Sequence, residues 1–144
     1  MIGMQHWVVT HNPHPIPDTH GWNVYFRKLP SRIPAIDDLV FFYETQTTFP
    51  GRDRPGEKAI VRLARVSGTP CPISGIEPWV YQVPCITLRE CFLPLAKASE
   101  IIKRPYFYRN NLTPISEMEY NEIEEECEAM RGHAAPPKGQ KISN

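Results

Sequence analysis

Prolines occur so often along this chain that they restrict its fold more than any other feature does. The 144 residues include 16 prolines, and each proline removes a backbone hydrogen-bond donor and cannot continue a helix. A long helix therefore fits only near the C-terminus, and strands and loops should dominate the rest. A chain of this length is typical of one domain. We expect that domain to cover residues 1–131, with a flexible tail over 132–144.

Runs of β-forming residues lie between the prolines. The predicted strands are Trp7–Thr10, Leu39–Glu44, Lys58–Val66 and Trp79–Thr87. The last run contains Pro84, which indicates an edge or a bulge at that point. The segment Gly21–Leu29 fits a short helix and a strand equally well. Three long strands in meander order after a lone first one favour a small closed or nearly closed sheet.

Two helices are predicted in the last third of the chain. Apolar residues recur at helical spacing over Leu95–Lys103, which indicates a short amphipathic helix. Ser116 and Glu119 have the spacing of a capping box, in which each side chain binds the backbone amide of the other. The helix that they begin should end at Gly132. Between the two helices, Tyr106–Arg109 is predicted to be a brief strand or a loop.

The formal net charge of zero conceals an uneven distribution of charge. Residues 1–116 hold 13 basic and 9 acidic side chains, whereas residues 117–128 hold seven Glu and neither Lys nor Arg. A mildly basic body suits a polyanionic partner. The Glu-rich helix is either a solvated surface or a contact for a protein partner through Glu122, Glu125 and Glu126.

Cysteine and histidine patterns argue against a metal site. The four cysteines form no CxxC pair, so neither a zinc ribbon nor a secreted disulfide framework is indicated. His11, His14, His20 and Asp18 could be drawn as a metal site, but they lie in a proline-rich segment without regular spacing. We expect no metal and no cofactor. No signal peptide and no apolar run of membrane-spanning length is visible, so we expect a soluble cytoplasmic protein with no membrane contact.

An aromatic strand is followed by a basic one. Phe41, Phe42 and Tyr43 lie on the first, and Arg62 and Arg65 lie on the second. Aromatic faces stack on nucleobases, and fixed cations pair with phosphates. Phe and Tyr are also ordinary strand formers that fill cores. For each of these rings, base stacking and plain packing both stay open.

The order of short landmarks resembles the EVE domain family of the PUA-like superfamily, whose relatives include YTH and ASCH domains. Trp7–Thr10 stands at the start, and Asp38–Tyr43 stands where the family has a Gly-Asp-aliphatic-aromatic strand. Arg109–Ser116 is similar to the family's Arg, then Leu, Pro-Ile-Ser and a capped helix. The similarity covers about residues 5–128. One departure is Asp37, which occupies the position of the family's Gly.

This resemblance implies an α+β fold, a PUA-like pseudobarrel of about five or six mostly antiparallel strands with short flanking helices and a capped C-terminal helix. It also implies a noncatalytic module that holds a modified nucleobase of DNA or RNA, a modified cytosine or adenine, in an aromatic pocket. The alternative is a hydrolase that acts on a modified nucleoside, as some ASCH-like members do. Lys58, Thr45 and either Glu44 or Glu57 would then be the reacting groups.

Residues for both parts of such a site can be named. The predicted base pocket consists of His11, Asn12, Trp22, Asn23, Tyr43, Phe107 and Tyr108. Stacking between two walls, Trp22 and Tyr43, with Phe107 and Tyr108 as second choices, would supply energy, and the amides would read the base edge. The predicted phosphate contacts are Arg52, Arg54, Lys58, Arg62, Arg65 and Arg109. Asn beside Pro is also typical turn chemistry, and exposed arginines are common.

Overall fold

The computed structural model describes residues 4–11, 22–45, 58–75 and 79–130. Within these ranges the strands are β1 (His6–His11), β2 (Val24–Phe26), β3 (Leu39–Glu44), β4 (Ala59–Val66), β5 (Cys71–Pro72), β6 (Tyr81–Val83), β7 (Cys85–Pro94) and β8 (Leu112–Ile115). The helices are α1 (Leu95–Ile101), the 3-10 helix η2 (Phe107–Arg109) and α2 (Glu117–Met130). The predicted α+β class is confirmed. The boundary to a tail at 132–144 lies outside the described residues and stays a prediction.

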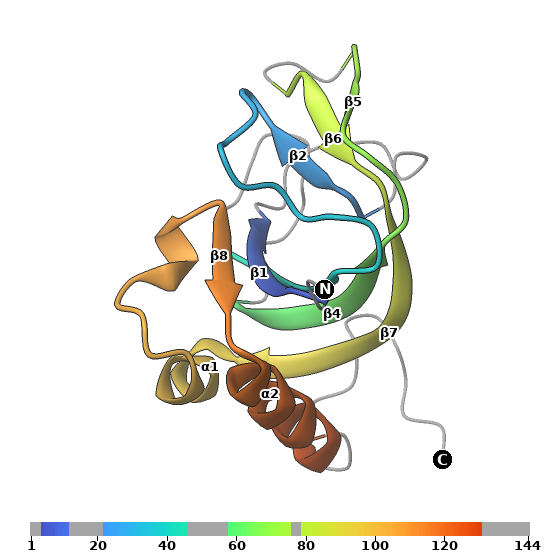
Figure 1. Ribbon diagram of the computed structural model, residues 1–144. Coiled ribbons are helices and arrows are strands. Elements are labelled where there is room, and N and C mark those ends of the chain that lie inside the picture. Colours follow the sequence, from blue (N-terminus) through green and yellow to red (C-terminus); the bar gives the residue numbers. More distant parts are fainter. Residues whose placement is uncertain (1–3, 12–21, 46–57, 76–78, 131–144) are drawn as a thin grey trace, which may run out of the picture.

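The strands form two sheets that together make an open pseudobarrel. The larger sheet has the order β7-β4-β3-β1-β8, and the smaller has the order β2-β6-β5. Of the pairs in the two sheets, β1 with β3 is parallel and the others are antiparallel. In Figure 1 the larger sheet curls strongly, with β2, β5 and β6 on one side of it and α1 and α2 on the other. β2 and β8 are each at an edge of their sheet, so the barrel is not closed.

Pro84 separates two strands that the sequence predicts as one. β6 ends at Val83 in the smaller sheet, and β7 begins at Cys85 in the larger one. Proline has no N–H for a ladder, so the pairing changes partner at this residue. The chain thereby passes from one sheet to the other without a loop. Farther on, the predicted strand or loop at Tyr106–Arg109 is instead the 3-10 helix η2.

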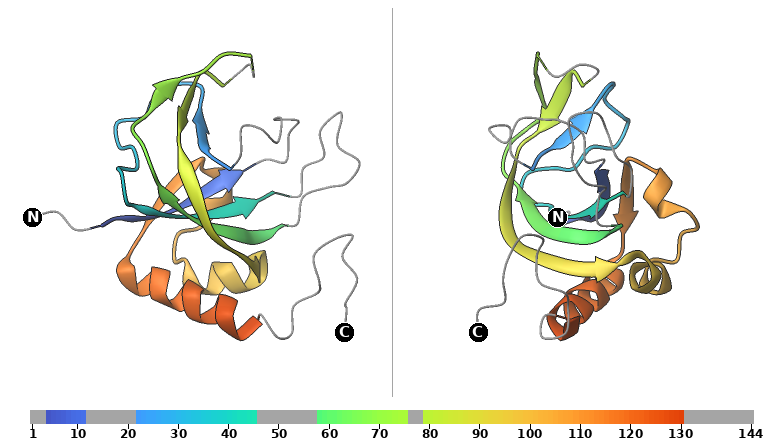
Figure 2. Two further views of the ribbon diagram at one scale, coloured as in Figure 1. Left: turned by 90° about the vertical axis from the view of Figure 1, so that its right-hand side faces the viewer. Right: turned by 180° about the vertical axis from the view of Figure 1, so that it is seen from behind.

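Two apolar cores lie on opposite faces of the larger sheet, because side chains alternate along a strand. Phe41 and Tyr43 of β3 belong to a helix-side core, which they share with Ile101 of α1 and Ile123 of α2. Phe42 of β3 belongs instead to an inter-sheet core, together with β2 and β6. Figure 2 shows the resulting layers, with the helices below the larger sheet and the smaller sheet above it. Both faces of β3 are therefore covered, which explains its unbroken apolar run.

A buried carboxylate fixes the turn before β3. Asp38 is 4% exposed and accepts hydrogen bonds from the Trp7 indole Nε1 at 3.0 Å, the Gln5 amide at 3.0 Å and the Ala35 amide at 2.8 Å. The preceding residue, Asp37, has φ of 77°, in the left-handed region that Gly adopts without steric cost. The Asp37 carboxylate pairs with Arg65 at 3.1 Å.

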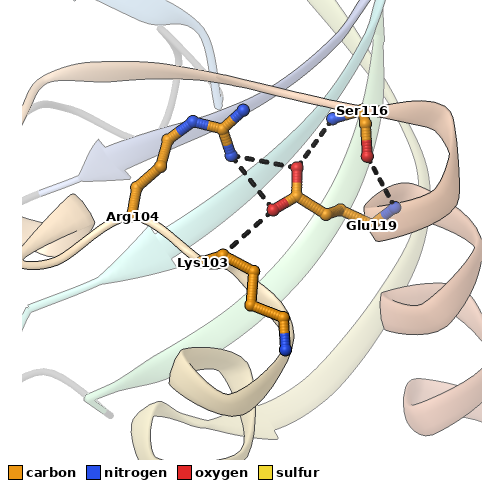
Figure 3. Close-up of polar contacts among 4 residues, drawn as sticks. All are labelled: Lys103, Arg104, Ser116 and Glu119. Atoms are coloured by element: carbon orange, nitrogen blue, oxygen red, sulfur yellow. Dashed lines mark hydrogen bonds and ion pairs between the residues drawn. The ribbon is translucent and has the colours of Figure 1, made fainter.

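The predicted capping box at the start of α2 is confirmed, and it does more than cap. The Ser116 amide donates to Glu119 Oε1 at 2.8 Å, and the Glu119 amide donates to Ser116 Oγ at 3.0 Å. Glu119 also accepts from the Arg104 guanidinium at 2.9 Å and from the Lys103 amide at 3.2 Å (Figure 3). Burial raises the pKa of Glu119, but these hydrogen bonds outweigh it and leave the pKa below its usual value. One carboxylate therefore joins α2 to the segment that follows α1.

Replacing Glu119 with glutamine should lower the free energy of unfolding by about 1 kcal/mol at pH 7, because the charge-assisted bonds to Arg104 and Lys103 are lost. Since the pKa of Glu119 is lowered on folding, its contribution is present above the unfolded pKa and disappears as pH falls through the folded one. Urea unfolding at pH 7 and at pH 3 would measure this. The two proteins should differ less at pH 3, and an equal difference at both pH values would contradict the assignment. Glu117→Gln, exposed in the same helical turn, is the control.

Some acidic side chains of α2 form ion pairs and hydrogen bonds within the protein. Arg89 of β7 pairs with Glu124 and Glu128, and Tyr120 donates to Glu124. Glu122 and Glu125 are exposed, and Glu126 is half-buried. A protein partner on these residues stays a prediction. Among the described residues, neither α1 nor α2 has the length and apolar character needed to cross a membrane.

Candidate functional site

The strongest candidate site lies where the pseudobarrel is open. β2 and β8 are edge strands of different sheets. Asn111, just before β8, joins them, since its Nδ2 donates to the Tyr25 carbonyl of β2 at 3.3 Å. The Asn111 carbonyl in turn accepts from the Thr10 amide of β1 at 3.0 Å. A hollow of about 570 Å³ opens at this gap. We call it the β2–β8 hollow.

Aromatic rings and cations surround the β2–β8 hollow. Phe26, Trp79 and Tyr108 supply the rings, and Arg27, Lys28 and Arg109 supply the charge. All three cationic side chains are exposed, and the Arg27 guanidinium lies 5.6 Å from the centre of the Trp79 ring. None of the described residues that line the hollow is acidic. The site is therefore apolar on its walls and positive at its rim.

Small polar groups complete the lining. They come from Thr10, Thr45, Asn110 and Asn111. The Thr10 hydroxyl oxygen is buried and has no hydrogen-bond partner within the described part of the chain. A buried hydroxyl is more stable with a hydrogen-bond partner than without one. Amide and hydroxyl groups can both donate and accept, which suits the edge of a heterocycle.

Two of the predicted site residues, Tyr108 and Arg109, line this hollow. Tyr43 and Phe107 are next to Tyr108, with ring centres 6.3 Å and 5.7 Å from its own. Tyr43 is 2% exposed and Phe107 is 1% exposed, so both support Tyr108 from behind. Burial, and then the neighbouring Tyr108, raise the pKa of Tyr43 to about 12. Tyr43 is therefore a neutral phenol at physiological pH.

Trp22 and Asn23 are placed elsewhere. Trp22 packs edge-on against Phe42 in the inter-sheet core, with ring centres 5.6 Å apart, while Tyr43 belongs to the helix-side core. The two rings are on opposite faces of β3 and do not form two walls of one slot. The Asn23 amide binds the protein itself, donating to Gln82 at 3.3 Å and accepting from the Cys85 amide at 2.9 Å. It joins β2 to the β6–β7 junction.

The predicted phosphate contacts on β4 are engaged within the protein. Arg62 lies 4.5 Å from the centre of the Trp22 ring and donates to Thr87 at 3.1 Å, and burial lowers its pKa. Arg65 pairs with Asp37. Lys58 is exposed at the start of β4. The predicted contacts Asn12, Arg52 and Arg54 and the side chain of His11 lie outside the described residues.

Eight of the ten described lining residues were not among the predicted pocket and phosphate contacts, and they include Trp79, Arg27 and Lys28. Trp79 starts a predicted strand, and Arg27 and Lys28 end a segment whose structure was ambiguous. The available signal was the succession Phe26-Arg27-Lys28, an aromatic residue followed by two cations. This run could not be assigned to a site, because β2 and β8 are far apart in the sequence and are brought together only by the tertiary structure.

No protein-family model and no curated protein matches the sequence. Solved structures do match the fold. ASCH from Zymomonas mobilis is 14% identical, with a TM-score of 0.58 over 83% of this chain and 94% of that one. Human THYN1, determined in complex with 5-methylcytosine-containing DNA, is 16% identical, with a TM-score of 0.52 over 86% and 98%. The Agrobacterium tumefaciens protein Atu2648 is 18% identical, with a TM-score of 0.50 over 95% and 99%.

Proposed function

Because the chain has the PUA-like fold that ASCH and the EVE-type protein THYN1 share, we propose that it is a nucleic-acid-binding module that holds one modified nucleobase in the β2–β8 hollow. The observation that carries this proposal is the composition of the hollow. Among the described residues, aromatic walls, small polar groups and a cationic rim without acidic side chains occur together at one opening. The volume of about 570 Å³ is in the range of sites for small organic ligands.

Each part of the hollow has a role in this proposal. Trp79 and Tyr108 offer faces on which a base extruded from its strand can stack. The Thr10 hydroxyl and the Asn110 and Asn111 amides can bind the edge of the base, which is where its identity is read. The cations at the rim neutralise the phosphates on either side. THYN1 is a precedent for a DNA partner on this fold.

The alternative is hydrolysis of a modified nucleoside. Glu44 is 4% exposed at the end of β3, whereas Lys58 is exposed with φ of 57°. Glu57 lies outside the described residues. Thr45 lines the hollow, but the other described lining residues stack, form hydrogen bonds or carry positive charge, and none of the described lining residues has a carboxylate. We therefore propose binding without turnover. Release of base or acyl group from an N4-acetylated cytidine, followed by mass spectrometry, would contradict this.

Titration with matched oligonucleotides tests the proposal. The probes are single strands of DNA and RNA that carry one 5-methylcytosine or one N6-methyladenine, each compared with the same strand without the methyl group. At least one modified strand should bind more tightly than its plain counterpart, because the modification is enclosed in the hollow. Equal affinity within every pair, or no binding at all, would refute a modified-base reader.

The salt dependence of oligonucleotide affinity distinguishes the cations at the rim of the hollow from the other cations of the protein. If Arg109 contacts a phosphate, Arg109→Gln should make the plot of log affinity against log salt less steep by about 0.7, the value for one phosphate of a single strand. Arg65→Gln is the matched control, since Arg65 pairs with Asp37 and does not line the hollow. Fluorescence anisotropy at several salt concentrations would measure both slopes. Equal loss of slope in the two variants would show that the phosphates do not follow the rim of the hollow.

A further inference from the structure

A second hollow adjoins the β2–β8 hollow. It measures about 390 Å³ and is formed by the segment between α1 and η2, with Lys103, Arg104 and Tyr106 among its lining residues. Tyr108 lines both hollows. As in the first hollow, none of the described lining residues is acidic. Tyr108 therefore borders both hollows, and rings and cations line each of them.

Tyr106 is exposed and held in an unusual conformation. Its side chain is 57% exposed, and its φ of 58° lies in the left-handed region, which is rare for a bulky residue. The segment is fixed on both sides, because Glu119 holds Lys103 and Arg104 (Figure 3) and Phe107 is in the helix-side core. Strain of this kind persists only where the surroundings impose it, and it is frequent at ligand sites.

A cation lies between the exposed ring and the first hollow. The Arg109 guanidinium is 4.6 Å from the centre of the Tyr106 ring, and Arg109 also lines the β2–β8 hollow. Tyr106 and Tyr108 have ring centres 6.1 Å apart. The Arg109 guanidinium thus lies next to both the exposed Tyr106 ring and the β2–β8 hollow. A dinucleotide has a matching order of base, phosphate and base, which would face the hollow, Arg109 and Tyr106 in turn.

We propose that Tyr106 stacks on the base next to the one in the β2–β8 hollow, with the phosphate that links the two nucleotides at Arg109. This inference rests on the proposed function and adds a second nucleotide subsite to it. The occupant is a single-stranded or locally unpaired segment, because a base can stack on a protein ring only when its own face is free. Lys103 at the second hollow would approach the next phosphate along the strand.

Two ligands distinguish this subsite from the first one. One is the modified mononucleotide whose base binds most tightly in the oligonucleotide titrations, and the other is a single-stranded trinucleotide with that base at its centre. Tyr106→Gly should weaken trinucleotide binding by about fivefold to a hundredfold, the range for loss of one stacked base, and should leave mononucleotide binding unchanged. Glycine accepts a positive φ without strain, so this variant should fold. Tyr106→Phe keeps the ring and should bind the trinucleotide as the wild type does.

Leu88→Ala is the matched control, since Leu88 is exposed on β7, at the opposite edge of the sheet from β8. If Tyr106→Gly binds the trinucleotide like this control while Trp79→Ala loses both ligands, the second subsite is refuted and the base site stands. If Tyr106→Gly weakens both ligands equally, Tyr106 belongs to the base site and the subsite is again refuted. If the wild-type protein binds neither ligand, the proposed function fails and the subsite fails with it.

Discussion

Replacing Asp38 with alanine should lower the free energy of unfolding by about 2 to 4 kcal/mol, because three N–H donors lose their acceptor and one of them is buried. Those donors are the amides of Gln5 and Ala35 and the buried indole of Trp7. The Asp38 carboxylate also joins β1 to the turn before β3. β1 and β3 are parallel neighbours in the sheet. Urea unfolding followed by tryptophan fluorescence would measure the loss.

Asp37→Asn is the matched control for this prediction. It removes an adjacent negative charge from an exposed ion pair with Arg65, and asparagine tolerates the left-handed φ at that position. Its effect should be below about 1 kcal/mol, as is usual for an exposed pair. A loss at Asp38→Ala no larger than that at Asp37→Asn would show that the buried hydrogen bonds contribute little.

Replacing Trp79 with alanine should weaken binding of the modified oligonucleotide by about fivefold to a hundredfold, the range for one lost base–aromatic stack. Trp79 lines the β2–β8 hollow and is half-buried just before β6. Its ring also faces Arg27, so the variant loses a wall and loosens one rim cation. Isothermal titration at constant salt would measure the change, with circular dichroism to verify the fold.

Trp22→Ala is the informative comparison for Trp79→Ala. Trp22 packs on Phe42 and lies under Arg62, away from the lining of the hollow. Its loss should reduce stability and leave the affinity of the folded protein close to that of the wild type. The reverse pattern, with binding lost at Trp22→Ala and retained at Trp79→Ala, would place the base in the interior of the barrel beside Arg62 and refute the β2–β8 hollow.

Local features of the chain were predictable because their causes are local. Ser116 and Glu119 are three residues apart, so a capping box needs only the helix that it starts. Pro84 has no N–H to donate to a ladder, and one strand ends and the next begins on either side of it. The long apolar runs predict strands regardless of their neighbours, although the sequence could not say that β1 would insert beside β3 in parallel.

The candidate site was only partly predictable. Tyr108 and Arg109, both named from the sequence as candidates, line the hollow, and their roles there stay predictions. Trp22 and Tyr43 are both aromatic and both near strands, and nothing local separates them. Trp22 packs on Phe42, and Phe42 and Tyr43 face opposite sides of β3 because side chains alternate along a strand. Only the tertiary structure shows which side of β3 Trp22 covers.

Taken alone, the order of residues determined where strands and helices could form, where α2 is capped, and that the charge is divided between a basic body and an acidic helix. Tertiary structure decided which rings and cations meet. Phe26 of β2 and Tyr108 of η2 are separated by 82 positions in the chain, and they line one hollow because the edge strands β2 and β8 lie near each other in the fold. Which edges adjoin depends on how both sheets bury their apolar faces, and no local pattern contains that information.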